Sequence, residues 1–235
     1  MVKRVLFYAV LIAITLVSVF PFVFSLLTSL KEPSKAFAPG LLPSPPTFHN
    51  YGDVFRSTPL FLTWVANSVI IAAISVVLLV LLALMAGYSF ARIPFPGRNA
   101  VFLIVLGSMM IPEQVLWIPN YATLAKIGWV NSWLGLIPGV VKTLTSGTFL
   151  VSQFLKSLPK ELEEAGILDG LSRYGMFWRI IVPLAGPVVA SMVITSFMAS
   201  WNAFAWPVIV LNSPELFTLP IASTSSRGST SPAGP

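Results

Sequence analysis

Long apolar runs separated by short charged segments dominate this sequence. No charged residue occurs from Val5 to Leu30, from Ser57 to Ala91 or from Ile180 to Pro214. About 20 apolar residues are enough to cross the hydrocarbon core of a bilayer, so each of these runs predicts one membrane-spanning helix.

Two more apolar runs predict spans with an interrupted backbone. Residues 99–112 are uncharged, but Glu113 follows directly after Pro112, and residues 127–155 contain a single charge at Lys142. Broken helices are tolerated at membrane depth where they are buried in protein or line a cavity. We therefore predict an all-α fold, a polytopic transmembrane helical bundle of about five spans.

The composition is typical of a membrane protein. Of the 235 residues, 56% are hydrophobic and 9% are charged, whereas soluble domains carry roughly 25% charged residues. Membrane lipid must therefore surround much of the surface. The formal net charge is +6. Apart from Lys3 and Arg4, however, no two basic residues adjoin and no basic helix face recurs, so we exclude nucleic acid as a partner.

The basic residues predict the orientation of the spans, because short cytoplasmic loops are enriched in Lys and Arg. With a cytoplasmic N-terminus, eight basic residues lie inside: Lys3, Arg4, Arg92, Arg98, Lys156, Lys160, Arg173 and Arg179. Five lie outside: Lys31, Lys35, Arg56, Lys126 and Arg227. The first uncharged run has 26 residues, which is longer than the apolar region of a signal peptide and predicts a retained anchor.

The segments between the spans predict loops and a tail. Residues 31–59 form a proline-rich outer loop with His49, the only histidine. A metal site needs several ligands, and we predict none here. Residues 1–222 are predicted to form one transmembrane permease domain, and residues 223–235 lack apolar periodicity and predict a disordered tail.

The inner loop at 156–179 differs from the other loops, because it holds eight of the chain's 22 charged residues. It predicts a short helix that begins near Pro159, carries acidic residues in its first turn and ends at Asp169 and Gly170. A second short helix from about Ser172 is expected to lead into the last span.

Residues suited to catalysis are scarce, so we predict neither an enzyme nor a bound cofactor. The charge of Lys142 inside a span leaves two interpretations open. An ionisable side chain in a span usually faces a cavity or a partner, which would place Lys142 on the transport pathway. In the second interpretation, its long side chain reaches toward the membrane interface.

One spaced pattern in the inner loop points to a family. Glu164-Ala165-Gly166 is followed after three residues by Gly170, and after nine more by Ile180-Ile181-Val182-Pro183. This pattern resembles the EAA loop of ABC importer permeases, with Gly166 and Val182 in place of an alanine and a leucine. The resemblance implies that a contact with a cytoplasmic ATP-binding subunit is formed by Glu164, Ala165, Gly166, Gly170, Ile180 and Pro183.

Other stretches resemble the carbohydrate-uptake branch of these permeases, which includes the second permease of the maltose transporter. They include AGYSFARIPFPGR at 86–98, MIPEQVLWIPNY at 110–121 and SWNAFAWPVIVL at 200–211. The resemblance implies a subunit that forms part of the translocation pathway for a sugar. It also implies a location in the inner (plasma) membrane of a prokaryote, and a sister permease and an extracytoplasmic solute-binding protein as further partners.

Two further expectations complete the picture. Such permeases usually have another span after the segment that matches residues 200–211, so the resemblance implies that a sixth span is missing. The alternative function is a secondary transporter or channel subunit, for which internal repeats of spans and paired intramembrane charges would be expected. Neither is evident in the sequence.

Overall fold

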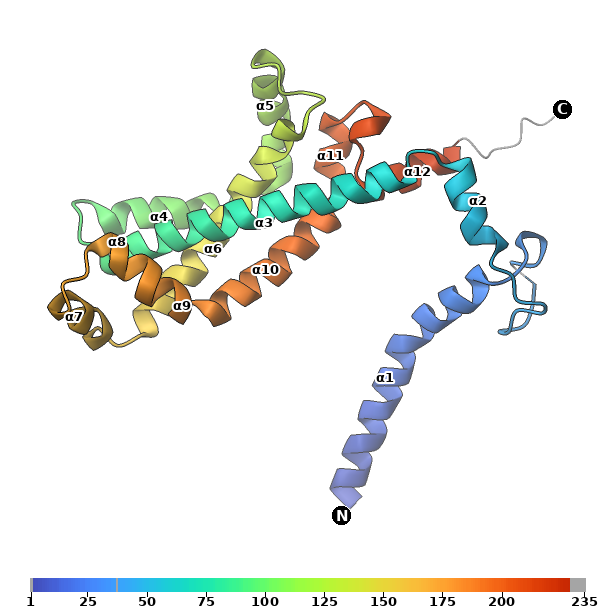
Figure 1. Ribbon diagram of the computed structural model, residues 1–235, viewed down its shortest axis with the longest axis horizontal. Helices are drawn as coiled ribbons and strands as arrows, with labels where there is room; N and C mark the ends of the chain where they lie inside the picture. The colour runs from blue at the N-terminus through green and yellow to red at the C-terminus, as the bar shows by residue number, and fades with distance from the viewer. Residues whose placement is uncertain (1, 37, 229–235) are drawn as a thin grey trace. The chain divides into compact units, whose positions relative to one another are not determined.

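The computed structural model describes residues 2–36 and 38–228, and every regular element within these ranges is a helix (Figure 1). The all-α fold predicted from the apolar runs is therefore confirmed. The chain forms two compact units, Met1–Phe61 and Leu62–Pro235.

The first unit contains one long helix and a folded loop. Its elements are α1 (Val2–Ser29), η1 (Pro33–Lys35) and α2 (His49–Ser57). None of the described side chains of α1 is buried, so this apolar helix needs lipid or another chain around it. The proline-rich loop folds around Lys31, whose ammonium donates to the carbonyls of Ala38 at 3.3 Å and Gly40 at 2.6 Å.

The second unit contains the remaining helices. In chain order they are α3 (Phe61–Arg92), α4 (Arg98–Ser108), α5 (Glu113–Lys126), η2 (Trp133–Leu136), α6 (Ile137–Ser157), α7 (Glu161–Leu168), α8 (Arg173–Met176), η3 (Phe177–Ile181), α9 (Val182–Leu184), α10 (Gly186–Trp201), α11 (Ala205–Val210), η4 (Pro214–Leu216) and α12 (Leu219–Gly228).

The described helices agree with the predicted number of spans. Three are long and apolar enough to cross a membrane: Lys3–Ser29, Phe61–Arg92 and Trp133–Ser157. Two bent pairs pass the same test together, α4 with α5 at 97° and the α8–α9 segment with α10 at 72°. Counting each bent pair as one span gives five.

The breaks fall partly where the sequence predicted them. The third span is interrupted between α4 and α5, next to Pro112, as expected. The fourth is continuous from Trp133 to Ser157, so the prediction of a break near Lys142 was wrong: a side-chain charge does not remove a backbone hydrogen bond. The fifth span bends instead at Ala185, between Pro183 and Pro187, because proline lacks the amide that would continue the helix.

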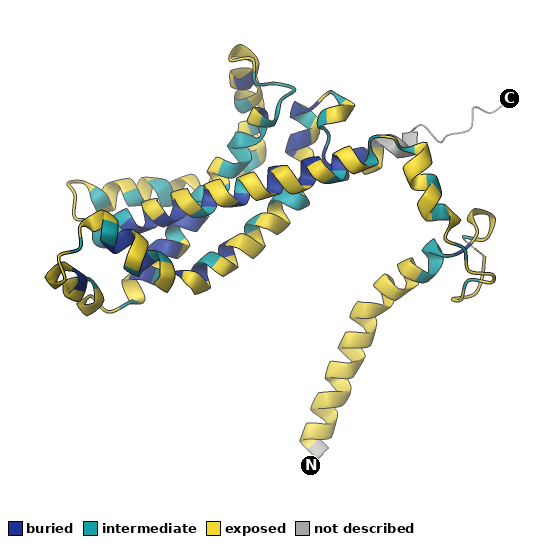
Figure 2. Cartoon of the chain, viewed as in Figure 1, coloured by how far each residue is buried: buried dark blue, intermediate teal, exposed yellow. Residues whose placement is uncertain are grey.

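Small residues allow α3 and α6 to pack closely, as is common between membrane helices. A Cβ placed on Gly87 would lie 2.5 Å from the side chain of Val151, and one on Gly147 would lie 3.0 Å from Ala83 Cβ. The core formed around this contact includes Tyr88, Val151, Leu155, Phe177, Ile181 and Met192. Figure 2 shows buried positions along α3 and around α8, whereas α7 is mostly exposed.

The predicted tail begins inside a helix. α12 runs from Leu219 to Gly228, so this helix extends into the segment that the sequence predicts as a tail. The hydroxyls of Ser223 and Thr224 donate to the carbonyls of Pro220 and Ile221 at 2.9 and 2.7 Å, and such local bonds need no apolar periodicity. Residues 229–235 lie outside the described residues.

Candidate functional site

α7 is a short helix with defined ends, placed near the C-terminal ends of α3 and α6 (Figure 1). Three acidic residues occupy its first turn, where carboxylates interact favourably with the helix dipole. At its other end, the amides of Leu171 and Gly170 donate to the carbonyls of Gly166 at 2.9 Å and Ile167 at 3.0 Å. Gly170 has φ +77°, the left-handed geometry in which glycine closes a helix.

The structure separates the six residues of the predicted coupling contact. Glu164 and Ala165 are exposed on α7, and Gly170 is exposed just after its C-terminal end. Gly166 is buried, because a Cβ there would lie 2.7 Å from Met176 Cε and 2.9 Å from Ile180 Cδ1. Gly166 and Ile180 therefore meet inside this subunit and seat α7 against the following helices.

Pro183 lies apart from this contact. It is exposed at the start of α9, next to the bend of the fifth span. Because proline lacks a backbone amide, its position is consistent with a role in the bend.

An ion pair ties α7 to the end of a membrane span. Arg92 Nε lies 2.9 Å from Glu163 Oε1, and the two side chains are only 7% and 20% exposed. The same guanidinium donates through Nη2 to the carbonyls of Leu155 at 2.6 Å and Leu158 at 2.7 Å. Arg92 thus connects α3, the C-terminal end of α6 and α7, a role that inspection of the sequence did not reveal.

The outer side of α7 and α8 presents apolar side chains. Leu168 is 89% exposed, Ile167 65% and Tyr174 75%. Together with the exposed Glu164 and Ala165 they form what we name the α7 surface. Exposed apolar groups beside charged ones are a common feature of protein interaction sites.

Lys142 has a partner within the chain. Its Nζ lies 2.8 Å from Oε2 of Glu113, the first residue of α5 after the break in the third span. An intramembrane charge is expected to pair in this way. Both residues line a cavity of about 380 Å³, and Glu113 also lines a second cavity of about 170 Å³.

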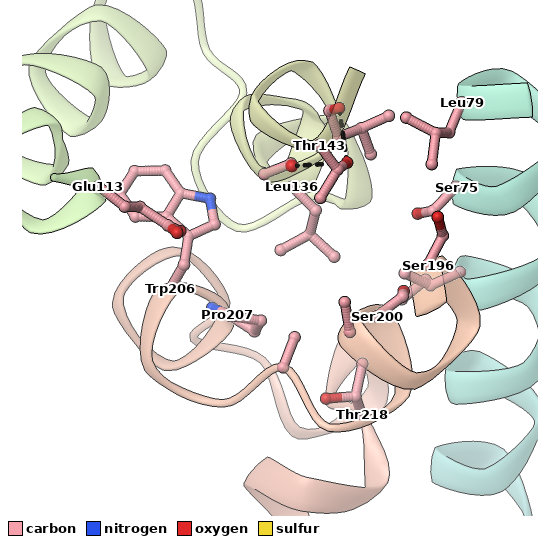
Figure 3. Close-up of a pocket in the computed structure, with 15 residues that line it drawn as sticks. Ser75, Leu79, Glu113, Leu136, Thr143, Ser196, Ser200, Trp206, Pro207 and Thr218 are labelled. Carbon is pink, nitrogen blue, oxygen red and sulfur yellow. Dashed lines mark hydrogen bonds between the residues drawn. The ribbon is translucent and has the colours of Figure 1, made fainter. Parts of the chain in front are cut away.

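Long-range hydrogen bonds shape the second cavity. Trp206 of α11 donates from its indole N–H to the carbonyl of Gly135 at 3.0 Å, which fixes the ring at the cavity wall. Asn67 of α3 donates to the carbonyl of Phe217 at 3.0 Å. The Asn67 bond holds the segment that follows η4 against α3, and this segment supplies Thr218 to the same cavity (Figure 3).

The fold and these contacts define a transport permease, a helical membrane subunit with a protruding helix tied to its spans. A family model described as "Binding-protein-dependent transport system inner membrane component" matches residues 79–232. The chain belongs to this family of inner membrane permeases.

Curated relatives agree with this assignment. The chain is 38% identical over 213 residues to the arabinooligosaccharides transport system permease protein AraQ of Halalkalibacterium halodurans, covering 88% of this chain and 76% of the relative. It is 30% identical over 228 residues to the trehalose/maltose transport system permease protein MalG of Thermococcus litoralis, covering 96% and 82%.

A solved structure shows the same fold. A bacterial ABC transporter involved in the import of the acidic polysaccharide alginate matches with a TM-score of 0.83 at 19% identity, over 100% of this chain and 82% of that chain. The comparisons confirm the predicted family, the assignment as an ABC importer permease and the inner membrane location. They do not favour a secondary transporter or channel.

Proposed function

We propose that this chain forms part of the translocation pathway for a neutral oligosaccharide, together with a sister permease, and that an extracytoplasmic solute-binding protein delivers the cargo. A cytoplasmic ATP-binding subunit drives transport by docking on the α7 surface. The cargo class follows the relatives, whose names specify arabinooligosaccharides and trehalose or maltose.

The exposed α7 surface is the observation that carries this proposal. Leu168 and Ile167 present apolar area on an otherwise charged loop, and a partner that covers them removes this area from water. Glu164 stands beside them, where a basic group of the partner can form a charge-assisted hydrogen bond. Lys142 contributes to the pathway side of the same subunit through its pair with Glu113.

The seating of α7 explains how a docked ATPase moves the spans. Gly166 and Ile180 hold the inner side of α7, and the Arg92–Glu163 pair joins it to α3 and α6. A displacement of α7 by the ATPase is therefore transmitted as the movement of a rigid unit rather than absorbed in a flexible loop.

Substitution of Gly170 tests the docking. Gly170→Arg places a bulky side chain beside the α7 surface, at a φ of +77° that costs an L-residue roughly 1–2 kcal/mol. The matched control is Gly97→Arg, because Gly97 has φ +74° and equally open space around its Cα but lies in the turn between α3 and α4. We expect Gly170→Arg to lose the copurifying ATPase and uptake, while Gly97→Arg retains both.

A second variant separates charge from shape. Glu164→Lys leaves the helix geometry in place and reverses the charge on the α7 surface, and we expect it to weaken copurification of the ATPase. Normal association and normal uptake in both Gly170→Arg and Glu164→Lys would remove α7 as the docking site.

A further inference from the structure

Hydroxyl groups from three parts of the chain converge on the 170 Å³ cavity. Ser75 comes from α3, Ser196 and Ser200 come from α10, and Thr218 comes from the segment after η4. Figure 3 shows their side chains around the cavity, with Trp206 and Glu113 at its other side.

Among the described residues, three of these hydroxyls lie in membrane helices and lack the hydrogen bond within the helix that is common there. Ser and Thr in a helix commonly donate to the carbonyl one turn earlier. Thr195, the neighbour of Ser196, does so toward Ser191 at 2.9 Å, and Ser89 of α3 toward Met85 at 2.8 Å. Within the described residues, Ser75, Ser196 and Ser200 have no side-chain hydrogen bond to a protein atom.

Thr218 gives the most direct sign of a ligand. The residue is 5% exposed, it lines the cavity, and its Oγ1 has no hydrogen-bond partner among the described residues. A buried hydroxyl without a partner costs about 1–3 kcal/mol. A protein tolerates this cost where the hydroxyl forms a hydrogen bond with a ligand that enters the site.

The other side chains around the cavity can bind the apolar face and the hydroxyls of a sugar ring. The buried ring of Trp206 is fixed by its bond to Gly135, and the C–H groups of a sugar face can pack on the electron-rich face of an aromatic ring. Glu113 uses Oε2 to bind Lys142, which leaves Oε1 to accept a hydrogen bond from a hydroxyl of the sugar. Lys142 acts as a positioning residue for this carboxylate.

The size and the position of the cavity agree with a sugar ring as its ligand. A cavity of 170 Å³ compares with the 10–15 Å³ needed for one water, so it has room for about a dozen heavy atoms, the size of one sugar ring. Ser75 lies near the middle of α3, and the cavity adjoins the break before α5, where Glu113 lines it. Transporters commonly bind substrates near the midplane, between discontinuous helices.

We propose that this cavity binds one ring of the transported neutral sugar, through the hydroxyls of Ser75, Ser196, Ser200 and Thr218, the ring of Trp206 and the carboxylate of Glu113. The proposal rests on the proposed function and adds a binding site within this subunit.

Protection of a single cysteine tests the site. The chain has no cysteine, so Ala203→Cys, on the cavity wall, can be alkylated with N-ethylmaleimide in the complete transporter and detected on this chain by mass spectrometry. We expect maltose or arabinotriose, whichever the wild type takes up, to slow alkylation at least threefold, and the acyclic polyol sorbitol to leave it unchanged. The control is Thr195→Cys on the same helix, outside the cavity, where neither compound should slow alkylation.

Thr218→Val in the Ala203→Cys background tests the hydroxyl itself. Since it removes a buried group without a partner, the sugar-free transporter should be as heat-stable as the parent or more so. The sugar concentration for half protection should rise about two- to tenfold, the factor for one lost hydrogen bond. Thr195→Val, which removes a hydroxyl bonded to its own helix, should leave that concentration unchanged.

The outcomes separate this site from the proposed function. A transporter that takes up the sugar but shows equal alkylation rates with and without it refutes the site and leaves the function standing. Equal protection by sorbitol and by the sugar also refutes it, because a site for the ring must distinguish the two. Absence of uptake for both sugars, measured separately, would contradict the proposed function and the site that rests on it.

Discussion

The link between α7 and the spans predicts a large effect for Arg92→Ala. Its guanidinium makes the ion pair to Glu163 at 2.9 Å and the two carbonyl contacts at 2.6 and 2.7 Å, with its side chain 7% exposed. Removing one partner of a buried pair costs roughly 3–5 kcal/mol, because the other charge is left without a partner. We expect α7 to lose its fixed seat in this variant.

The magnitude can be stated as a shift in population. A change of 1.4 kcal/mol is tenfold in an equilibrium constant, so 3–5 kcal/mol moves the balance between seated and unseated α7 by about 10² to 4 × 10³. Glu163→Gln should have a smaller effect, about 1–2 kcal/mol, since it removes the carboxylate charge from the ion pair while Arg92 keeps its two carbonyl contacts.

Spin-label distances provide the assay. Labels on Leu168→Cys in α7 and Phe95→Cys in the turn before α4, both exposed positions, should give a narrow distance distribution in the parent and a broad one with Arg92→Ala. The amount of sugar moved per ATP hydrolysed should fall at least tenfold. Arg98→Ala is the matched control, because Arg98 lies nearby at the start of α4 but makes no ion pair among the described residues. A narrow distribution and unchanged coupling in Arg92→Ala would refute the reasoning.

Two further substitutions probe the contacts on each side of the site. Gly166→Ala gains about 1 kcal/mol of helix propensity but crowds the flexible end of Met176 at 2.7 Å, so copurification of the ATPase should change little. Gly166→Leu should abolish copurification. Equal behaviour of the two variants would contradict the buried position of Gly166. Lys142→Leu leaves the Glu113 carboxylate without its partner, and we expect reduced uptake, with Lys142→Arg as the control that keeps the pair. Unchanged expression, assembly and uptake in Lys142→Leu would favour the second interpretation, in which the side chain of Lys142 only reaches toward the membrane interface.

The apolar runs carry enough information to predict most of the fold. Uncharged stretches long enough to span a bilayer became α1 and α3, and Pro112 marked the break between α4 and α5. The continuous fourth span was harder to predict, since a lysine is costly in lipid but acceptable beside a carboxylate. Glu113, 29 residues away, supplies that carboxylate, and nothing local in the sequence shows it.

The position of the proposed coupling site along the chain was predictable, but the surface that it presents was not. Motif spacing located α7, and Gly170 adopts the left-handed φ expected at a helix end. The spacing could not show that Gly166 faces inward, because this depends on where Met176 and Ile180 lie after the chain turns back. Arg92 and Thr218 were missed for the same reason: their roles arise from contacts between distant parts of the chain.

The central claim is that this chain is the permease of an ATP-driven importer and docks its ATPase through α7. The most direct test is to purify the tagged chain from its native membrane in mild detergent and to measure the intact complex by mass spectrometry. The account predicts a complex with a second permease and an ATP-binding subunit, and loss of the ATP-binding subunit alone with Gly170→Arg. Recovery of the folded chain without any ATP-binding subunit, or equal complexes with and without the substitution, would contradict it.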